Sequence, residues 1–172
     1  MLIESIGGEY RRYKKLGEAV LDRLSDEELN QPLGPHGNSV TMLVWHLGGN
    51  LTSRFTDFLT SDGEKPWRNR DEEFQPRVES KVSIMEKWNG GWATLFSALG
   101  TLSDDSLGEQ VKIRGEALTV ADALTRSLAH TAYHVGQMVW VGKGILGKEW
   151  ESLSIPLGKS EEANKRIARQ KE

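Results

Sequence analysis

Apolar residues recur every three or four positions in four long segments of this 172-residue chain. Such spacing places apolar side chains on one face of an α-helix, and it predicts helices over residues 2–24, 39–60, 77–100 and 119–142. Ser39 and Thr119 are good N-cap residues for the second and fourth helices, and the glycines at 142 and 144 predict where the fourth one stops. Helices that are apolar on one side must pack together, so the sequence predicts an all-α fold, a four-helix bundle, with one domain spanning residues 1–172.

The segments outside these helices carry weaker signals. Leu24–Leu29 and Leu102–Leu107 both place a serine before acidic residues, which predicts a short helical turn after the first and third helices. Residues 110–118 favour either a small β-hairpin or an irregular lid. The polar C-terminal tail is expected to dock on the bundle through its few apolar residues, Leu153, Ile155, Pro156 and Leu157.

A long charged loop, Ser61–Gln75, joins the second and third helices. Ten of its fifteen residues are charged, Trp or Phe. Connections in bundles usually need about two to eight residues, so this loop is longer than a simple bundle topology demands. Two interpretations remain open: Arg68 and Arg70 bind a carboxylate or phosphate of a substrate, or they pair with the loop's own carboxylates, Asp62, Glu64, Asp71 and Glu73.

Composition excludes several classes of protein. A net charge of −3 and a pI near 5.9 argue against binding nucleic acid through phosphate contacts. The absence of cysteine removes disulfides, thiolate metal ligands and cysteine nucleophiles. No apolar run reaches the roughly 18 residues that span a membrane, and the N-terminus does not resemble a signal peptide. A cytoplasmic protein without membrane or nucleic-acid partners is therefore expected.

Three of the four histidines form a candidate metal site. His130 and His134 lie one turn apart and share a helix face, and His46 lies on the apolar side of the second helix. Polar residues follow the inward face of the fourth helix where leucines would be usual, and buried polar groups need partners. Three imidazoles with one open position are typical of catalytic zinc. His36 lies in a Pro-Gly turn and is expected to be an exposed loop residue.

The missing motifs narrow the chemistry. No glutamate lies between His130 and His134, so the metalloprotease motif is absent, and the chain has no serine elbow or phosphate loop. The remaining chemistry belongs to the metal, which can activate a bound water or thiol, or polarise a carbonyl. Asn50, Tyr133 and Gln137 are candidates to orient the site or its ligand; for each, a purely structural hydrogen bond is the alternative.

The chain resembles the DinB superfamily of bacterial four-helix proteins, and within it a branch common in Bacillus-like bacteria. The superfamily resemblance rests on Val44-Trp45-His46-Leu47 in the second helix and on Ala129–Gln137 in the fourth. The resemblance to the branch rests on further short sequence motifs: His46-Leu47-Gly48-Gly49-Asn50, Thr56-Asp57-Phe58-Leu59, Asp62–Asp71 and Leu153-Ser154-Ile155-Pro156. The resemblance implies an up-down-down-up bundle, Zn²⁺ or Ni²⁺ on His46, His130 and His134, and a homodimer.

Relatives in that superfamily include transferases that use bacillithiol or mycothiol, a thiol-dependent isomerase and hydrolases. We therefore expect a metal-dependent transferase that joins a bacillithiol-like low-molecular-weight thiol to a small electrophile. A metal-dependent hydrolase of a small substrate is the alternative within enzymes. A metal-binding stress-response module without catalysis is the alternative outside them.

Overall fold

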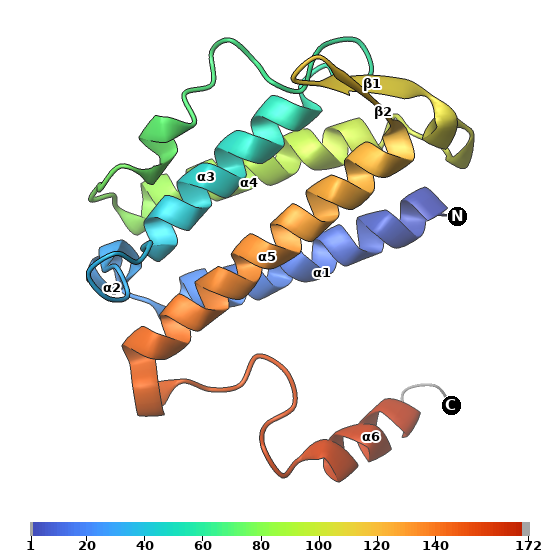
Figure 1. The fold of residues 1–172 in the computed structure, drawn as a ribbon. Helices are drawn as coiled ribbons and strands as arrows, with labels where there is room; N and C mark the ends of the chain where they lie inside the picture. The colour runs from blue at the N-terminus through green and yellow to red at the C-terminus, as the bar shows by residue number, and fades with distance from the viewer. Residues whose placement is uncertain (1, 170–172) are drawn as a thin grey trace.

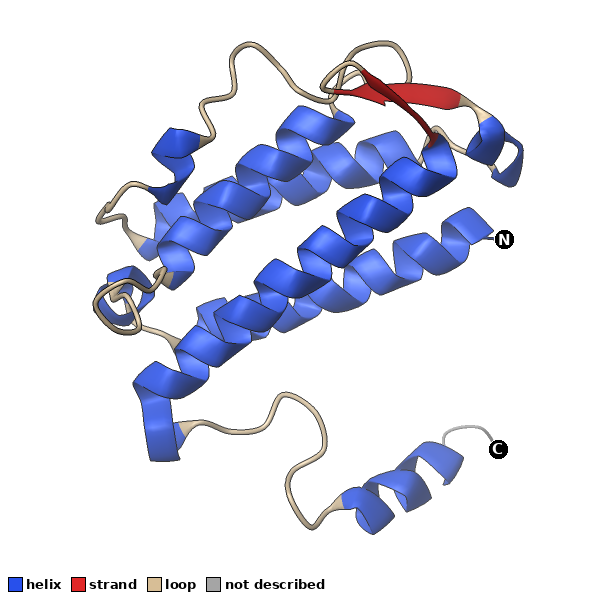
Figure 2. Ribbon diagram, in the orientation of Figure 1, coloured by secondary structure: helices blue, strands red, loops and turns tan. Residues whose placement is uncertain are grey.

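Helices make up most of the computed structural model, which describes residues 2–169 (Figures 1 and 2). A single β-hairpin is the sheet structure of this part of the chain. Within it, no helix is both long enough and apolar enough to cross a lipid bilayer. The elements in chain order are α1 (Leu2–Arg23), α2 (Asp26–Asn30), α3 (Val40–Phe55), η1 (Asp71–Phe74), α4 (Lys81–Leu99), η2 (Asp104–Gly108), β1 (Gln110–Ile113), β2 (Glu116–Thr119), α5 (Val120–Leu146), η3 (Gly147–Glu149) and α6 (Ser160–Arg169).

The four predicted long helices are α1, α3, α4 and α5, and two of them are shorter than expected. Helix α3 ends at Phe55 rather than near 60, because Thr56 is extended and Asp57 has a left-handed φ of 48°. Helix α4 begins at Lys81 rather than 77, because the Ser80 side chain accepts a hydrogen bond from the Ser83 backbone N–H and caps the helix.

Helix α5 is longer than predicted and runs past its two late glycines. A Cβ at Gly144 would lie 2.8 Å from both terminal carbons of Leu33, and a Cβ at Gly142 would lie 3.0 Å from Val20 Cγ1. These glycines therefore allow close packing inside the helix rather than ending it. The helix ends at Gly147, whose φ of 54° favours glycine.

Helices α3 and α4 run in one direction, and α1 and α5 run in the other (Figure 1). The start of α3 lies beside the start of α4, where Asn30 Nδ2 donates to the Glu79 carbonyl and Thr41 Oγ1 donates to Asn30 Oδ1. A loop that joins two parallel helices must run back along the whole length of the first helix. For α3, with 16 residues, that length is about 24 Å. The expectation that the charged loop is longer than topology demands was therefore wrong.

The core lies between the four long helices and is built from aliphatic and aromatic side chains. Trp88 and Trp92 of α4 are almost fully buried, as is Tyr10 of α1, which donates a hydrogen bond to the Leu124 carbonyl. Helices α3 and α4 approach closely because a Cβ at Gly91 would lie only 2.8 Å from the Gly48 Cα. This contact fixes α3, and with it His46, against the core.

The short elements agree with the sequence. Ser25 forms a capping box at the start of α2, and Ser103 forms one at the start of η2. Strands β1 and β2 pair in an antiparallel hairpin, which is the first of the two structures expected for residues 110–118. Asp62 in the charged loop accepts hydrogen bonds from the backbone N–H groups of Arg114 and Gly115, so the loop is attached to the hairpin turn.

The prediction of a docked tail is mostly wrong. Leu153 packs against the core, but Leu157 is fully exposed and Ile155 is also exposed. Helix α6 lies apart from the bundle in Figure 1. Trp150, just before the tail, does pack on the bundle: its ring lies beneath the Arg23 guanidinium and close to Gly142 of α5.

Candidate metal centre

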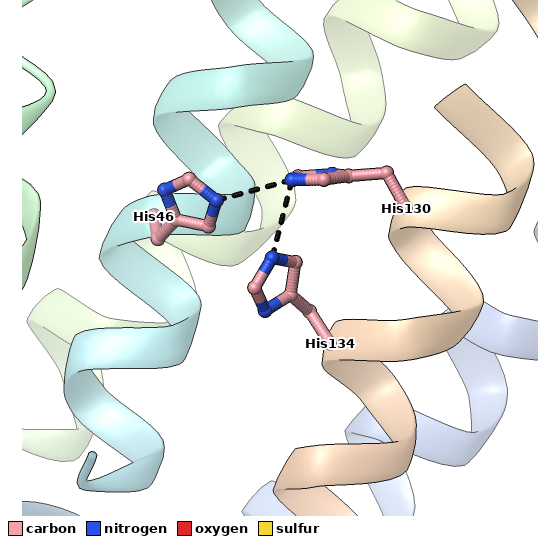
Figure 3. Close-up of side chains that lie close together, drawn as sticks. All are labelled: His46, His130 and His134. Carbon is pink, nitrogen blue, oxygen red and sulfur yellow. Dashed lines mark hydrogen bonds between the residues drawn. The ribbon is translucent and has the colours of Figure 1, made fainter. Parts of the chain in front are cut away.

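The three predicted histidines come together between α3 and α5. His46 extends from α3, and His130 and His134 extend from successive turns of α5 (Figure 3). The His130 Nε2 lies 3.1 Å from the Nε2 of His46 and 3.1 Å from the Nε2 of His134. Ligand nitrogens about 2.0–2.1 Å from a tetrahedral zinc lie about 3.3 Å apart. These two spacings are close to that value, and the three ligand nitrogens all lie within 4.8 Å of one another, so together they could hold a single ion.

The environment keeps two of the imidazoles neutral. Burial lowers the pKa of His130 to about 3, helped by the charges of His134 and His46. Burial and the charge of His46 also lower the pKa of His134 to about 4. Neutral imidazole is the form that binds metals, so both rings are ready to act as ligands at neutral pH.

Hydrogen bonds set the tautomers of His46 and His134. The Nδ1 of His46 lies 2.9 Å from Glu73 Oε2, and the Nδ1 of His134 lies 2.8 Å from Gln137 Oε1. Both oxygens are acceptors, so each Nδ1 carries the proton and each Nε2 carries a lone pair. Both lone pairs are directed at His130 Nε2 (Figure 3).

Neither tautomer of His130 gives both of its ring nitrogens a hydrogen-bond partner. Its Nδ1 is buried without a hydrogen-bond partner. A proton on Nε2 leaves the Nδ1 lone pair unpaired, and a proton on Nδ1 brings three Nε2 lone pairs together. A divalent cation at the meeting point of the three Nε2 atoms would accept all three lone pairs, with the His130 proton on Nδ1, which still lacks a hydrogen-bond acceptor. The donor set therefore fits Zn²⁺ or Ni²⁺.

Glu73 and Arg68 orient the His46 ring through its Nδ1 atom, on the side away from the cluster. Both carboxylate oxygens of Glu73 accept hydrogen bonds from Arg68, at 2.9 and 2.8 Å. Burial alone would raise the pKa of Glu73, but the hydrogen bonds from Arg68 and His46 outweigh it, so the pKa is lowered. A carboxylate bonded to the outer nitrogen of a ligating histidine fixes the ring and increases its basicity.

The sequence did not predict that Glu73 contacts His46. It indicated Glu73 only as a possible ion-pair partner of Arg68 or Arg70. The two residues are separated by 27 positions, and no local spacing connects them. One signal does exist, in the Gly48-Gly49 pair after His46. A Cβ at Gly49 would lie 2.1 Å from Glu73 Oε1, so the glycine makes room for the carboxylate.

Replacing Gly49 with alanine is expected to displace Glu73 and weaken metal binding about 10–100-fold, the usual effect of losing a carboxylate behind a ligating histidine. Competition with a chromophoric zinc chelator measures the affinity. Gly90→Ala is the control, because a Cβ there meets nothing within 4 Å. Equal zinc affinity in Gly49→Ala and wild type would show that the carboxylate's position is unimportant.

The histidines line a cavity of about 460 Å³, which we call the histidine pocket. It brings together every residue that the sequence singled out for the site. Asn50 is buried one turn after His46, and Gln137 Nε2 donates to the exposed Tyr133 hydroxyl at 3.2 Å. Ala123 and Ser127, on the predicted inward face of the fourth helix, also line it. The pocket further contains residues that the sequence did not place in the site: Asn38, Arg54, Phe55, Phe58, Phe74, Ile113, Arg114 and Arg126.

Arg68 and Arg70 pair with two of the charged loop's carboxylates, Glu73 and Asp71, as one of the two interpretations expected. Two others have different partners: Glu64 pairs with Arg54 and Arg114, and Asp62 accepts from backbone N–H groups. Arg68 is only 2% exposed and is committed to Glu73. Arg70 lies 3.9 Å from Asp71 and over the Phe74 ring, with half of its side chain exposed. Arg70 is therefore the freer of the two to meet a substrate. His36 is exposed, as expected.

The metal-free protein is expected to lose stability as pH falls from about 6.5 towards 4. An unfolded histidine takes up its proton near pH 6.5, whereas folded His130 and His134 resist protonation until about 3 and about 4. The unfolded state therefore binds more protons in this window, and stability falls by up to about 1.4 kcal/mol per pH unit for each histidine.

Urea unfolding in the presence of a chelator, at pH 7 and at pH 5, measures this loss. His130→Ala should flatten the dependence, and His36→Ala should leave it unchanged. An identical pH dependence in wild type and His130→Ala would contradict the assignment.

These features define a mostly helical protein with a three-histidine cluster in the wall of a pocket. The chain belongs to the family described as "Protein of unknown function (DUF1572)", which matches residues 2–159. It is similar to the crystal structure of the conserved protein of locus from Enterococcus faecalis, with a TM-score of 0.65 and 19% sequence identity over 84% of this chain and 97% of that one. This likeness shows a shared fold. No curated protein matches the chain.

Proposed function

We propose that this protein is a metal-dependent transferase of the DinB superfamily that joins a bacillithiol-like thiol to a small electrophile. The observation that carries the proposal is the meeting of three Nε2 atoms, 3.1 Å apart along the cluster, in the wall of a cavity of about 460 Å³. The order of the histidines along the helices supports placing the family in that superfamily. A homodimer in the cytoplasm completes the proposal.

His46, His130 and His134 would hold Zn²⁺ or Ni²⁺. A bound ion of this kind supplies Lewis-acid chemistry, which lowers the pKa of a thiol or water in its open position. Glu73 and Gln137 keep the Nε2 lone pairs of His46 and His134 turned towards the ion, through their hydrogen bonds to the two Nδ1 atoms. The protein has no cysteine of its own, so a thiol nucleophile must come from a co-substrate.

The charges around the cluster favour an anionic nucleophile such as a thiolate. Arg68 and Arg54 help to lower the pKa of His130, and Arg70 does so for His134, which shows that their positive potential reaches the site. Asn50 and Tyr133 line the same pocket and offer hydrogen bonds to a bound substrate.

Incubation of bacillithiol with monobromobimane tests the proposal. Zinc- or nickel-loaded protein should accelerate formation of the thiol adduct, and the metal-free protein and His134→Ala should not. Acceleration that is unchanged in His134→Ala would rule out the metal mechanism. Turnover of ester or amide substrates without added thiol would favour the hydrolase, and metal binding without any turnover would favour the stress-response module.

A further inference from the structure

Among residues 2–169, five arginines line the histidine pocket, and no aspartate or glutamate does. The arginines come from three parts of the chain: α3, the charged loop, and the hairpin with the adjoining start of α5. They are Arg54, Arg68, Arg70, Arg114 and Arg126. A pocket walled by cations without carboxylates attracts anions.

Few carboxylates are bonded directly to these guanidinium groups. Glu64 Oε2 accepts hydrogen bonds from both Arg54 and Arg114, at 3.1 and 2.9 Å, so one carboxylate oxygen serves two arginines. Asp62, the other carboxylate at this end, directs its oxygens to backbone N–H groups instead. The guanidinium groups at the hairpin end therefore keep donors available for an anionic ligand.

Two of the other arginines have only weak partners. Arg126 lies 3.8 Å from Glu116, with both side chains more than half exposed, and the contact of Arg70 with Asp71 is equally long. Exposed pairs of this kind contribute little free energy. Both guanidinium groups are free to exchange these partners for a ligand.

The arginines also repel one another. The pKa of Arg54 is lowered first by burial; the hydrogen bond and charge of Glu64 oppose this shift, and the positive charges of Arg68 and Arg114 add a smaller lowering. An anionic ligand would relieve this repulsion. The protein would therefore bind it more tightly than a neutral ligand of the same shape.

The pocket has two chemically different ends. Along α3, His46 is followed by Asn50 one turn later and by Arg54 two turns later, which is about 12 Å along the helix axis. Helix α5 runs the opposite way, so Ser127 and Arg126 precede its histidines (Figure 1). Phe55, Phe58 and Ile113 add an apolar wall near the hairpin end.

The hairpin holds Arg114 in place at that end. Arg114 has a left-handed φ of 55° in the turn between β1 and β2. Asp62 fixes this turn by accepting hydrogen bonds at 2.8 Å from the Arg114 N–H and at 2.7 Å from the Gly115 N–H. The backbone of the arginine is thus positioned before any ligand arrives, while its side chain is about half exposed.

We propose that Arg114 and Arg126 form an anion subsite that binds a carboxylate or phosphate at one end of an elongated substrate, whose other end reaches the three histidines. The middle of such a substrate is apolar and lies against Phe55, Phe58 and Ile113. This proposal rests on the metal centre proposed above, which binds the head of the same molecule.

Two ligands that differ only at the far end provide the test: ω-mercaptooctanoate and ω-mercaptooctanol. Calorimetric titration of the zinc-loaded protein should show the carboxylate binding about tenfold more tightly or better, the effect of one or two charge-assisted hydrogen bonds. The preference should disappear in Arg114→Gln/Arg126→Gln, while the affinity for the alcohol stays the same. Arg12→Gln, an exposed arginine on α1 outside the pocket, is the matched control.

Equal affinity for the two thiols in wild type, or a preference that survives in the double variant, would overturn the subsite. Octanoate, octyl phosphate and octanol, titrated into the metal-free protein, separate this failure from a failure of the metal centre. If zinc does not bind, the subsite still predicts that the two anions bind more tightly than octanol and that the double variant removes the difference. The stronger of octanoate and octyl phosphate identifies the anionic group, and no preference for either anion over octanol would again overturn the subsite.

Discussion

Replacing Glu73 with alanine is expected to lower the free energy of unfolding by about 3–5 kcal/mol. The Arg68 side chain is 2% exposed, and its only carboxylate partner among the described residues is Glu73, itself 8% exposed. Removing the carboxylate leaves a buried guanidinium without a counter-charge, which costs far more than losing an exposed ion pair. Urea unfolding of the metal-free protein at pH 7 measures the change.

A second variant shows that the loss comes from the unpaired charge. Arg68→Met/Glu73→Leu removes both charges and keeps apolar volume, so it should recover most of the lost stability. Glu72→Ala, at the neighbouring exposed glutamate, is the control and should change stability by less than about 0.5 kcal/mol. A loss below about 1 kcal/mol in Glu73→Ala would show that Arg68 is not held by this pair.

His134→Ala should weaken zinc binding about 100–1,000-fold. Structural zinc sites bind with about 10–16 kcal/mol in total, so one of four ligands contributes about 2.5–4 kcal/mol, and about 1.4 kcal/mol corresponds to tenfold. Its ring is mostly buried and its Nε2 lies 3.1 Å from that of His130, so a water replaces it poorly. Chelator competition measures the affinity.

His36→Ala is the matched control for this measurement, because it removes an imidazole that is exposed and does not line the histidine pocket. It should bind zinc as wild type does. Similar zinc affinities for His134→Ala and His36→Ala would mean that the ion binds elsewhere.

The helices could be predicted from the sequence because their signals are local. Apolar spacing and the caps at Ser39 and Thr119 act within a few residues, and the structure has both caps. The function of the glycines at 142 and 144 depends on Val20 and Leu33, which approach only in the folded protein. A stop signal and a close-packing site therefore look the same in the sequence.

The histidine cluster could be predicted because the His130–His134 spacing is also local and only one further strong candidate exists. The residues that orient the cluster and complete its pocket could not be predicted. Glu73 reaches His46 only because α3 and α4 run parallel and the returning loop runs beside α3 (Figure 1). Arg114 joins the pocket only because Asp62 attaches the hairpin turn to that loop. Contacts of this kind depend on tertiary structure and leave no spacing to recognise.

The metal content of the purified protein, measured by elemental analysis with X-ray absorption at the metal edge, tests the account most directly. We predict about one zinc or nickel ion per chain, bound by three imidazole nitrogens and one exchangeable ligand. Protein that retains its helices but holds no metal and takes up neither Zn²⁺ nor Ni²⁺ would contradict the account.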